Sequence, residues 1–76
     1  MDQETVDRPE SDLAVAVVSR RKALGVTQRE VAEMAGCDPA FVGDLENGKP
    51  SVRLDKVRAV LDVLGLELTI RVRSTL

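Results

Sequence analysis

No stretch narrows the possible folds of this chain as much as QREVAEMAGCDPAFVGDLEN, residues 28–47. A small residue, Ala32, stands at its fifth place, and a glycine, Gly36, stands at its ninth. Apolar residues occupy the fourth, eighth, tenth, fifteenth and eighteenth places: Val31, Ala35, Cys37, Val42 and Leu45. Two short helices that cross near a right angle and touch at a small residue bury such a set. The stretch therefore predicts two helices joined by a tight turn at Gly36.

Capping residues mark the ends of these two predicted helices. Thr27 precedes the first helix and Glu30 follows three residues later, which is the pattern of a capping box. Asp38 is a suitable N-cap for the second helix, and Pro39 suits its first position. The Asn-Gly pair at 47–48 favours the end of that helix.

Helical spacing continues on both sides of this pair. It predicts a first helix from about Leu13 to the glycine at 25, with an N-cap at Ser11 or Asp12, and a last helix over 54–64. The expected inner face of the first helix comprises Leu13, Ala16, Val17 and Leu24. The expected inner face of the last helix comprises Leu54, Val57, Val60, Leu61 and Leu64.

The hydrophobic period changes to two after Gly65. In the sequence LELTIRV, apolar residues alternate with polar ones, which predicts one β-strand. Its apolar positions are Leu66, Leu68, Ile70 and Val72. A single strand has unpaired backbone groups, and pairing with a second copy across a two-fold axis would satisfy them. We therefore expect a homodimer; a frayed tail or a fifth helix is the alternative.

The predicted architecture is mainly α, with a four-helix domain over residues 12–65 and a dimerisation strand over 66–73. Residues 1–11 are expected to form a disordered acidic arm ahead of the domain. The net charge of −2 is unevenly distributed: residues 1–12 carry one basic and five acidic groups, and residues 13–76 carry ten basic and eight acidic groups. The folded part is therefore mildly basic, so the overall charge does not argue against a nucleic-acid partner.

Composition excludes several classes of function. With one cysteine and no histidine, the chain cannot form an internal disulfide or a Cys/His zinc site, and a cytoplasmic location fits. The single aromatic residue, Phe41, argues against a protein that stacks bases on aromatic side chains. Neither a membrane-spanning run nor a secretory signal is evident. Without histidine, a nucleophile paired with a base, or a phosphate-binding loop, we expect no enzyme and no cofactor.

The helix-turn-helix spacing, the capping box before it and LENGK after it resemble the Xre/phage-repressor family over roughly residues 13–64. The ending SVRLDKVRAVLDVLGLELTIRV is more specifically similar to HipB-type antitoxins. The resemblance implies a dimeric repressor that binds double-stranded operator DNA and a HipA-like kinase toxin. It also implies a four-helix domain followed by a strand shared between subunits.

The resemblance assigns roles to individual positions. Gln28 matches a residue that contacts phosphate and supports the reading helix, while Asn47 to Lys49 match a turn that clamps the DNA backbone. Arg21 and Glu46 match an ion pair between the first and third helices. The full set of expected DNA contacts is Thr27, Gln28, Arg29, Asp38, Pro39, Ala40, Gly43, Asp44, Asn47, Lys49 and Arg53.

The expected base-facing residues depart from the family pattern. Pro39 and Ala40 offer no side-chain hydrogen bonds, Gly43 offers only close approach, and Asp44 can accept a hydrogen bond from cytosine N4 but repels phosphate. Affinity is therefore expected to depend on phosphate contacts, with Lys22 and Lys56 as further candidates, and preference on DNA shape and half-site spacing. A protein-interaction module that restrains a toxin, with weak or no DNA binding, is the alternative.

Other residues have ordinary structural interpretations. Cys37 is expected to be a buried, inert thiol, and Phe41 is expected to pack against the first helix. Arg20, Lys22 and Arg29 can serve either as phosphate contacts or as solvated surface. Arg58 is expected to face solvent, whereas Arg71 and Arg73 can face solvent or a partner.

Overall fold

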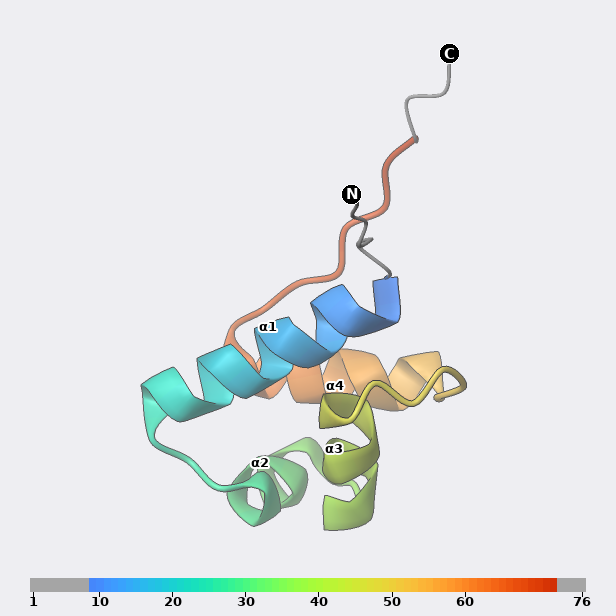
Figure 1. Cartoon of the computed structure of the whole chain (residues 1–76). Coiled ribbons are helices and arrows are strands. Elements are labelled where there is room, and N and C mark those ends of the chain that lie inside the picture. Colours follow the sequence, from blue (N-terminus) through green and yellow to red (C-terminus); the bar gives the residue numbers. More distant parts are fainter. Residues whose placement is uncertain (1–8, 73–76) are drawn as a thin grey trace.

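The computed structural model describes residues 9–72, and it contains four α-helices in that range (Figure 1). They are α1 (Pro9–Leu24), α2 (Gln28–Ala35), α3 (Pro39–Glu46) and α4 (Leu54–Leu64). The four-helix part of the predicted fold is confirmed. α1 begins at Pro9, two residues before the earlier of the two expected caps, because proline has a pre-set φ and lacks only an N–H that the first turn leaves unpaired. The rest of the expected acidic arm, residues 1–8, lies outside the described residues.

The four helices pack against one another around one interior. α1 contacts α3 and α4, and α2 also contacts α3 and α4. Figure 1 shows α2 and α3 together at one end of the body. The start of α1 and the end of the described segment after α4 lie on the side away from them. This arrangement leaves the α2–α3 end free of both ends of the described chain.

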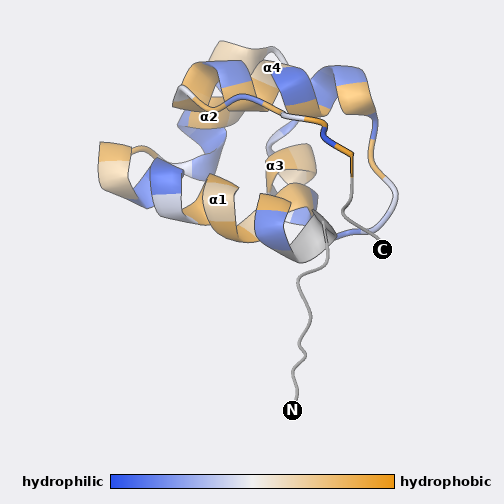
Figure 2. Cartoon of the chain, turned by 90° about the horizontal axis from the view of Figure 1, so that it is seen from above, coloured by the Kyte–Doolittle hydropathy of each residue, from blue (hydrophilic) through white to orange (hydrophobic). Residues whose placement is uncertain are grey.

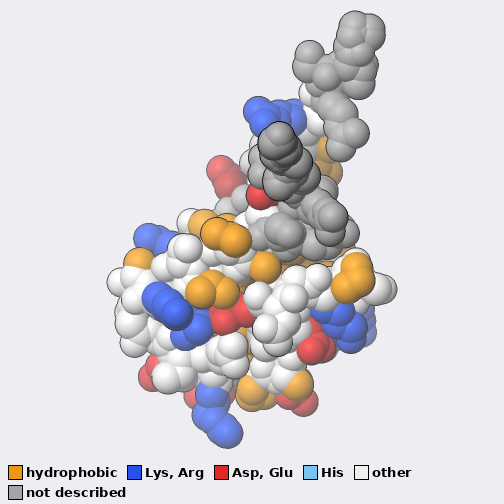
Figure 3. Space-filling model, in the orientation of Figure 1, with side chains coloured by type: hydrophobic (Ala, Val, Ile, Leu, Met, Phe, Trp, Pro, Cys, Tyr) orange, Lys and Arg blue, Asp and Glu red, His pale blue; other side chains and the backbone are white. Residues whose placement is uncertain are grey.

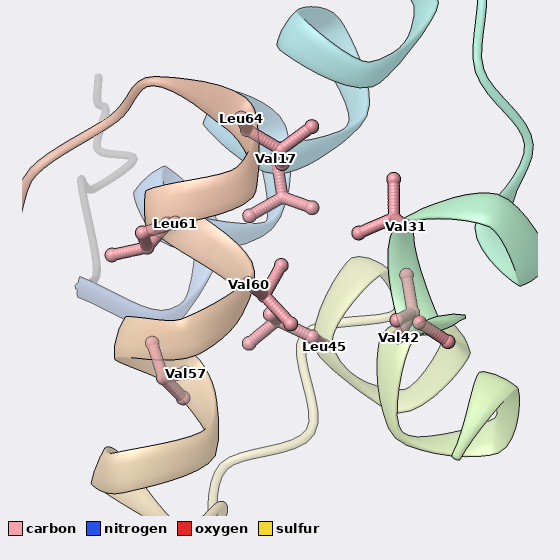
Figure 4. Packing of buried hydrophobic residues seen from close by; sticks show 9 residues of the cluster. Val17, Val31, Val42, Leu45, Val57, Val60, Leu61 and Leu64 are labelled. Atoms are coloured by element: carbon pink, nitrogen blue, oxygen red, sulfur yellow. The ribbon is translucent and has the colours of Figure 1, made fainter. Parts of the chain in front are cut away.

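A single cluster of aliphatic side chains joins the four helices. Figure 4 shows Leu64 of α4 against Val17 of α1, and Val60 of α4 against Leu45 of α3. Ala32 is fully buried where α2 and α3 meet, as its place in the spacing predicted, because a larger side chain would hold the two helices apart. The cluster comprises Val17, Val31, Ala32, Val42, Leu45, Val57, Val60, Leu61 and Leu64.

Three positions expected on inner helix faces are exposed instead. They are Ala16, Leu24 and Leu54, of which Leu24 is 46% and Leu54 58% exposed. In α1 the inward residues are Leu13, Ala14, Val17, Val18 and Arg21, so the predicted inner positions Leu13 and Val17 are confirmed. Arg21 shares this face, and its side chain reaches Glu46 of α3.

The turn between α2 and α3 depends on a left-handed residue. Gly36 has φ 73°, a conformation that glycine adopts without the steric cost of a Cβ. The Cys37 amide then donates to the Ala32 carbonyl at 3.0 Å, which satisfies a free carbonyl at the helix end. The predicted turn at Gly36 is confirmed.

Residues 66–72 follow α4 as a segment that is neither helix nor strand in this single chain. Figure 2 shows apolar and polar residues alternating along it. Leu66 packs against the core, whereas Leu68, Ile70 and Val72 are 48%, 90% and 95% exposed. The strand and its pairing therefore stay predictions, and Arg73 at the end of the expected segment lies outside the described residues.

Candidate nucleic-acid interface

The N-terminus of α2 is closed by a reciprocal cap. The Thr27 hydroxyl accepts from the Glu30 amide at 3.0 Å, and the Glu30 carboxylate accepts from the Thr27 amide at 2.8 Å. The expected capping box is therefore confirmed. It fixes the direction of the chain at the first turn of α2, where Gln28 and the exposed Arg29 lie.

α3 presents a face that takes little part in packing. Asp38 caps the helix by accepting from the Ala40 amide at 2.8 Å, with Pro39 at the first position, as predicted. Val42 and Leu45 point into the core. Pro39 and Ala40 are exposed, while Gly43 and Asp44 are half-buried. The four residues expected to face base edges thus lie on the outer side of α3. Their contact with DNA stays a prediction.

One carboxylate joins three helices behind this face. Glu46 of α3 accepts from Arg21 of α1 through Nε at 2.6 Å and Nη2 at 3.2 Å, the forked geometry that suits a guanidinium. Gln28 of α2 donates from Nε2 to the same carboxylate at 2.9 Å. Arg21 also donates to the Val26 carbonyl at 3.0 Å, which ties in the loop before α2. The expected Arg21–Glu46 pair is therefore present, and Gln28 supports α3 as part of the same network.

The charges of this network are stabilised in place. Burial raises the pKa of Glu46, but the hydrogen bonds from Arg21 and Gln28 together with the Arg21 charge outweigh it, so the pKa lies below its ordinary value. For Arg21, the hydrogen bond to Glu46 raises the pKa despite the opposing effect of burial. Both groups stay charged around neutral pH, so the link between α1 and α3 is a true ion pair.

Two of the expected phosphate-binding cations already have acidic partners. Lys49 Nζ lies 3.5 Å from Asp44, and Arg53 Nη2 lies 2.8 Å from Asp55. Both pairs are largely exposed to water, so each is weak and easily exchanged. The hydrogen bond from Arg53 lowers the pKa of Asp55. A phosphate at this edge would have to compete with these carboxylates.

Arg20 has a structural role that sequence reasoning did not assign. Its Nε donates to the Leu64 carbonyl at 2.7 Å, which satisfies the C-terminal end of α4. The two residues are 44 positions apart in the sequence, so no local pattern signals the contact. Arg20 therefore belongs to the packing of α1 on α4, and neither expected role describes it.

Most of the other charged and polar residues with predicted roles lie at the surface. Lys22, Arg29, Arg58 and Arg71 are exposed, as is Asn47, while Lys56 is half-buried. Phe41 packs against the core cluster and lines an open hollow with Val52 and Lys56. Cys37 is half-buried, not fully buried as expected, because it sits at the edge of the α2–α3 turn. Burial raises the pKa of its thiol despite the nearby Lys56, which keeps it in the unreactive protonated form.

The visible surface carries both signs of charge. In the view of Figure 3, basic and acidic side chains alternate over the body and do not form one continuous basic area. Among residues 9–72, no three His, Cys, Asp or Glu side chains are grouped so as to hold a metal ion. Within the same range, no helix has the length and apolar character needed to cross a membrane.

Two short helices that meet at a small residue, turn at a glycine and expose one face of the second helix define a helix-turn-helix domain. The sequence pattern of the family described as "Helix-turn-helix" matches residues 18–70. The chain therefore belongs to the helix-turn-helix family of DNA-binding transcription regulators, of the Xre-like type.

Particular relatives narrow this class. The chain is 38% identical over 60 residues to the "Uncharacterized HTH-type transcriptional regulator y4mF" of Sinorhizobium fredii, and the match covers 79% of each protein. It is also similar to HipB in two solved structures. In the HipA-HipB-O2-O3 complex, the TM-score is 0.77 at 26% identity, covering 96% of this chain and 100% of the other. In the HipB-O4 20mer complex, the TM-score is 0.78 at 25% identity, covering 93% and 100%.

Proposed function

We propose that this chain is a homodimeric transcriptional repressor that serves as the antitoxin of a HipA-like toxin and represses its own operon. The observation that carries the proposal is the Arg21–Glu46–Gln28 network. It holds α3 rigidly against α1 and α2 while Ala40 and Gly43 on its outer side are left out of the buried core. A helix fixed from behind and free in front is the arrangement that a major-groove reader needs.

DNA contact is proposed to have two components. Phosphates would meet the N-terminus of α2 at Gln28, the Arg29 side chain and the edge formed by Lys49 and Arg53. At Lys49 and Arg53, a phosphate would have to displace the paired carboxylates of Asp44 and Asp55. This exchange would reduce the net gain in binding free energy. The set with proposed roles here, including the caps, is Thr27, Gln28, Arg29, Asp38, Pro39, Ala40, Gly43, Asp44, Asn47, Lys49 and Arg53.

Direct base recognition would be limited. Ala40 can touch a thymine methyl, and Asp44 can accept from cytosine N4. Further preference would come from DNA shape and from two half-sites about 34 Å apart, the spacing that places two reading helices in successive major grooves.

The second copy is proposed to pair through residues 66–72. Alternating exposure supports this, since Ile70 and Val72 are almost fully exposed apolar residues in the single chain. Leu54, unexpectedly exposed at the start of α4, lines the same hollow as Leu68 and Ile70. A paired strand from a second copy would cover all of these residues at once, and it would explain why Leu54 is apolar.

A HipA-like kinase toxin is the proposed protein partner, because HipB occurs with HipA in the HipA-HipB-O2-O3 complex. Co-purification of the tagged chain with the product of the adjacent gene tests this directly. Absence of a complex would remove the toxin from the proposal and leave the repressor.

The repressor itself is tested by a mobility-shift titration with DNA from the chain's own promoter at several salt concentrations. We expect a specific complex that weakens with salt, and Lys49→Ala should weaken it equally for all operator variants. Arg58→Ala, which removes the same charge from the exposed side of α4, serves as the matched control. It should bind normally, and sedimentation verifies that it has the same oligomeric state as the wild type. If no specific complex forms at low salt, the repressor proposal is wrong.

A second candidate is a protein-interaction module that restrains a toxin with little DNA contact. Asp44 favours it, because a carboxylate on the outer side of α3 opposes phosphate and already pairs with Lys49. A toxin complex formed without any specific DNA complex would support this candidate over the repressor.

A further inference from the structure

The folded chain gives no reason for a glycine at position 43. The other four glycines all have positive φ, between 71° and 78°, whereas Gly43 has the ordinary backbone of a helix interior. Glycine destabilises such a position relative to alanine, because it loses more conformational freedom on folding. Its presence in the middle of α3 therefore calls for another explanation.

Steric crowding within the protein does not supply one. A Cβ built at Gly43 would have one atom within 4 Å, Oε1 of Gln28 at 3.9 Å, which is an ordinary van der Waals contact. Alanine would fit without displacing anything. The missing Cβ thus leaves a notch on the outer side of α3, bordered by Gln28 and lying one turn after the exposed Ala40.

The chemistry of the notch is set by the network behind it. The Glu46 carboxylate can only accept hydrogen bonds, so its contact with Gln28 must be made by Nε2, and this leaves Oε1 on the Gly43 side. Asp44, the next residue, is also an acceptor. Gln28 Oε1 therefore offers no donor to guanine, whose major-groove edge presents only the acceptors N7 and O6. Thymine presents a single acceptor, O4, beside an apolar C5-methyl group that needs no hydrogen bond.

We propose that the notch at Gly43 admits the C5-methyl group of a thymine, so that Gly43 determines sequence preference at one base pair of each half-site. The thymine methyl is the apolar group of the major groove, and it matches the volume that a Cβ would otherwise fill. Because Gly43 has no side chain, α3 can approach the base closely enough for this contact. This inference rests on the proposed DNA binding.

The test exchanges methyl groups between protein and DNA. In the operator, each thymine is replaced in turn by deoxyuridine, which lacks the C5-methyl but pairs identically. For the wild-type dimer, one thymine per half-site should lose about fourfold in affinity on replacement, the equivalent of one buried methyl group. Gly43→Ala should lose about tenfold in affinity at each half-site, as for a mismatched base pair, and therefore about a hundredfold for the dimer on the unmodified operator. It should bind better when that same thymine is replaced, because the alanine methyl then occupies the freed space.

Thermal unfolding separates a folding defect from a lost contact. Gly43→Ala should melt about 3–8 °C above the wild type, so weaker binding cannot result from unfolding. Ser19→Ala, on the exposed side of α1, is the matched control that raises helix propensity without touching α3. The inference is overturned if Gly43→Ala prefers the same thymine as the wild type, or if no thymine methyl matters to the wild type. A wild-type chain that forms no operator complex would overturn the proposed function, and this inference with it.

Discussion

Replacing Glu46 with alanine should lower the free energy of unfolding by about 2–3 kcal/mol. The change removes three charge-assisted hydrogen bonds, two from Arg21 and one from Gln28. It also leaves the Arg21 guanidinium without its carboxylate. Loss of one partner from a buried pair costs about 3–5 kcal/mol. The Arg21 side chain is 15% exposed, so water can replace part of what is lost, and the lower figure follows.

A loss of this size is large for so short a chain. Stability of about 0.05–0.15 kcal/mol per residue implies roughly 4–11 kcal/mol in total, so the melting temperature should fall by about 10–20 °C. Circular dichroism during heating and urea titration measures it. All variants must be compared at one protein concentration, because the proposed dimer would melt at a temperature that depends on concentration.

Asp55→Ala is the matched control, because it also removes a carboxylate paired with an arginine. Its pair with Arg53 is exposed on both sides, so only its place in the first turn of α4 should contribute, and a clearly smaller change than for Glu46→Ala is expected. If Glu46→Ala unfolds within about 0.5 kcal/mol of the wild type, the network does not hold the helices together.

The same network gives stability a defined dependence on pH. The pKa of Glu46 is lower in the folded chain than its ordinary value of 4.5, so its contribution is complete above pH 4.5. The contribution is lost as pH falls through the lowered pKa. Glu46→Gln keeps the shape of the side chain without the charge. The stability difference between the wild type and this variant should therefore shrink below pH 4.5, and a constant difference down to pH 2 would contradict the assignment.

Three further outcomes are expected. Thr27→Ala should cost about 1 kcal/mol in urea unfolding through loss of the α2 cap, and an unchanged midpoint would argue against the cap. Asp44→Asn should tighten binding to non-specific DNA and steepen the salt dependence by freeing Lys49. Unchanged affinity for non-specific DNA in a salt titration would show that the pair does not oppose phosphate. Ile70→Asp should yield a monomer by sedimentation with helical content retained, and a persisting dimer would place the subunit contact elsewhere.

Local signals predicted the helices well. The capping box at Thr27, the Asp38 cap with Pro39, and the turn at Gly36 each depend on a few neighbouring residues, so their chemistry is readable directly from the sequence. The contact between α2 and α3 was predictable as well, because only a small residue such as Ala32 fits it. The pairing of Arg21 with Glu46 came from family resemblance and not from any local pattern.

Contacts between distant residues were not readable in this way. Arg20 caps α4 across 44 positions, and Arg21 reaches Glu46 across 25. Ala16 and Leu24 are exposed although their spacing is that of the inner face. Leu54 was assigned to the core by helical period, which does not distinguish burial within one chain from burial against a second copy. For the candidate site, sequence supplied the positions on α3 but not the self-pairing of Lys49 with Asp44.

Because Glu46 holds α3 from its inner side, mutations on the inner and outer sides of this helix should have different effects on folding. Glu46 anchors the helix and Asp38 starts it, whereas the side-chain positions at Ala40 and Gly43 lie outside the buried core. New side chains at these two outer places could therefore be selected from a library with little risk of unfolding. Duplicated copies of such a gene would be free to diverge toward different operators while sharing one unaltered scaffold.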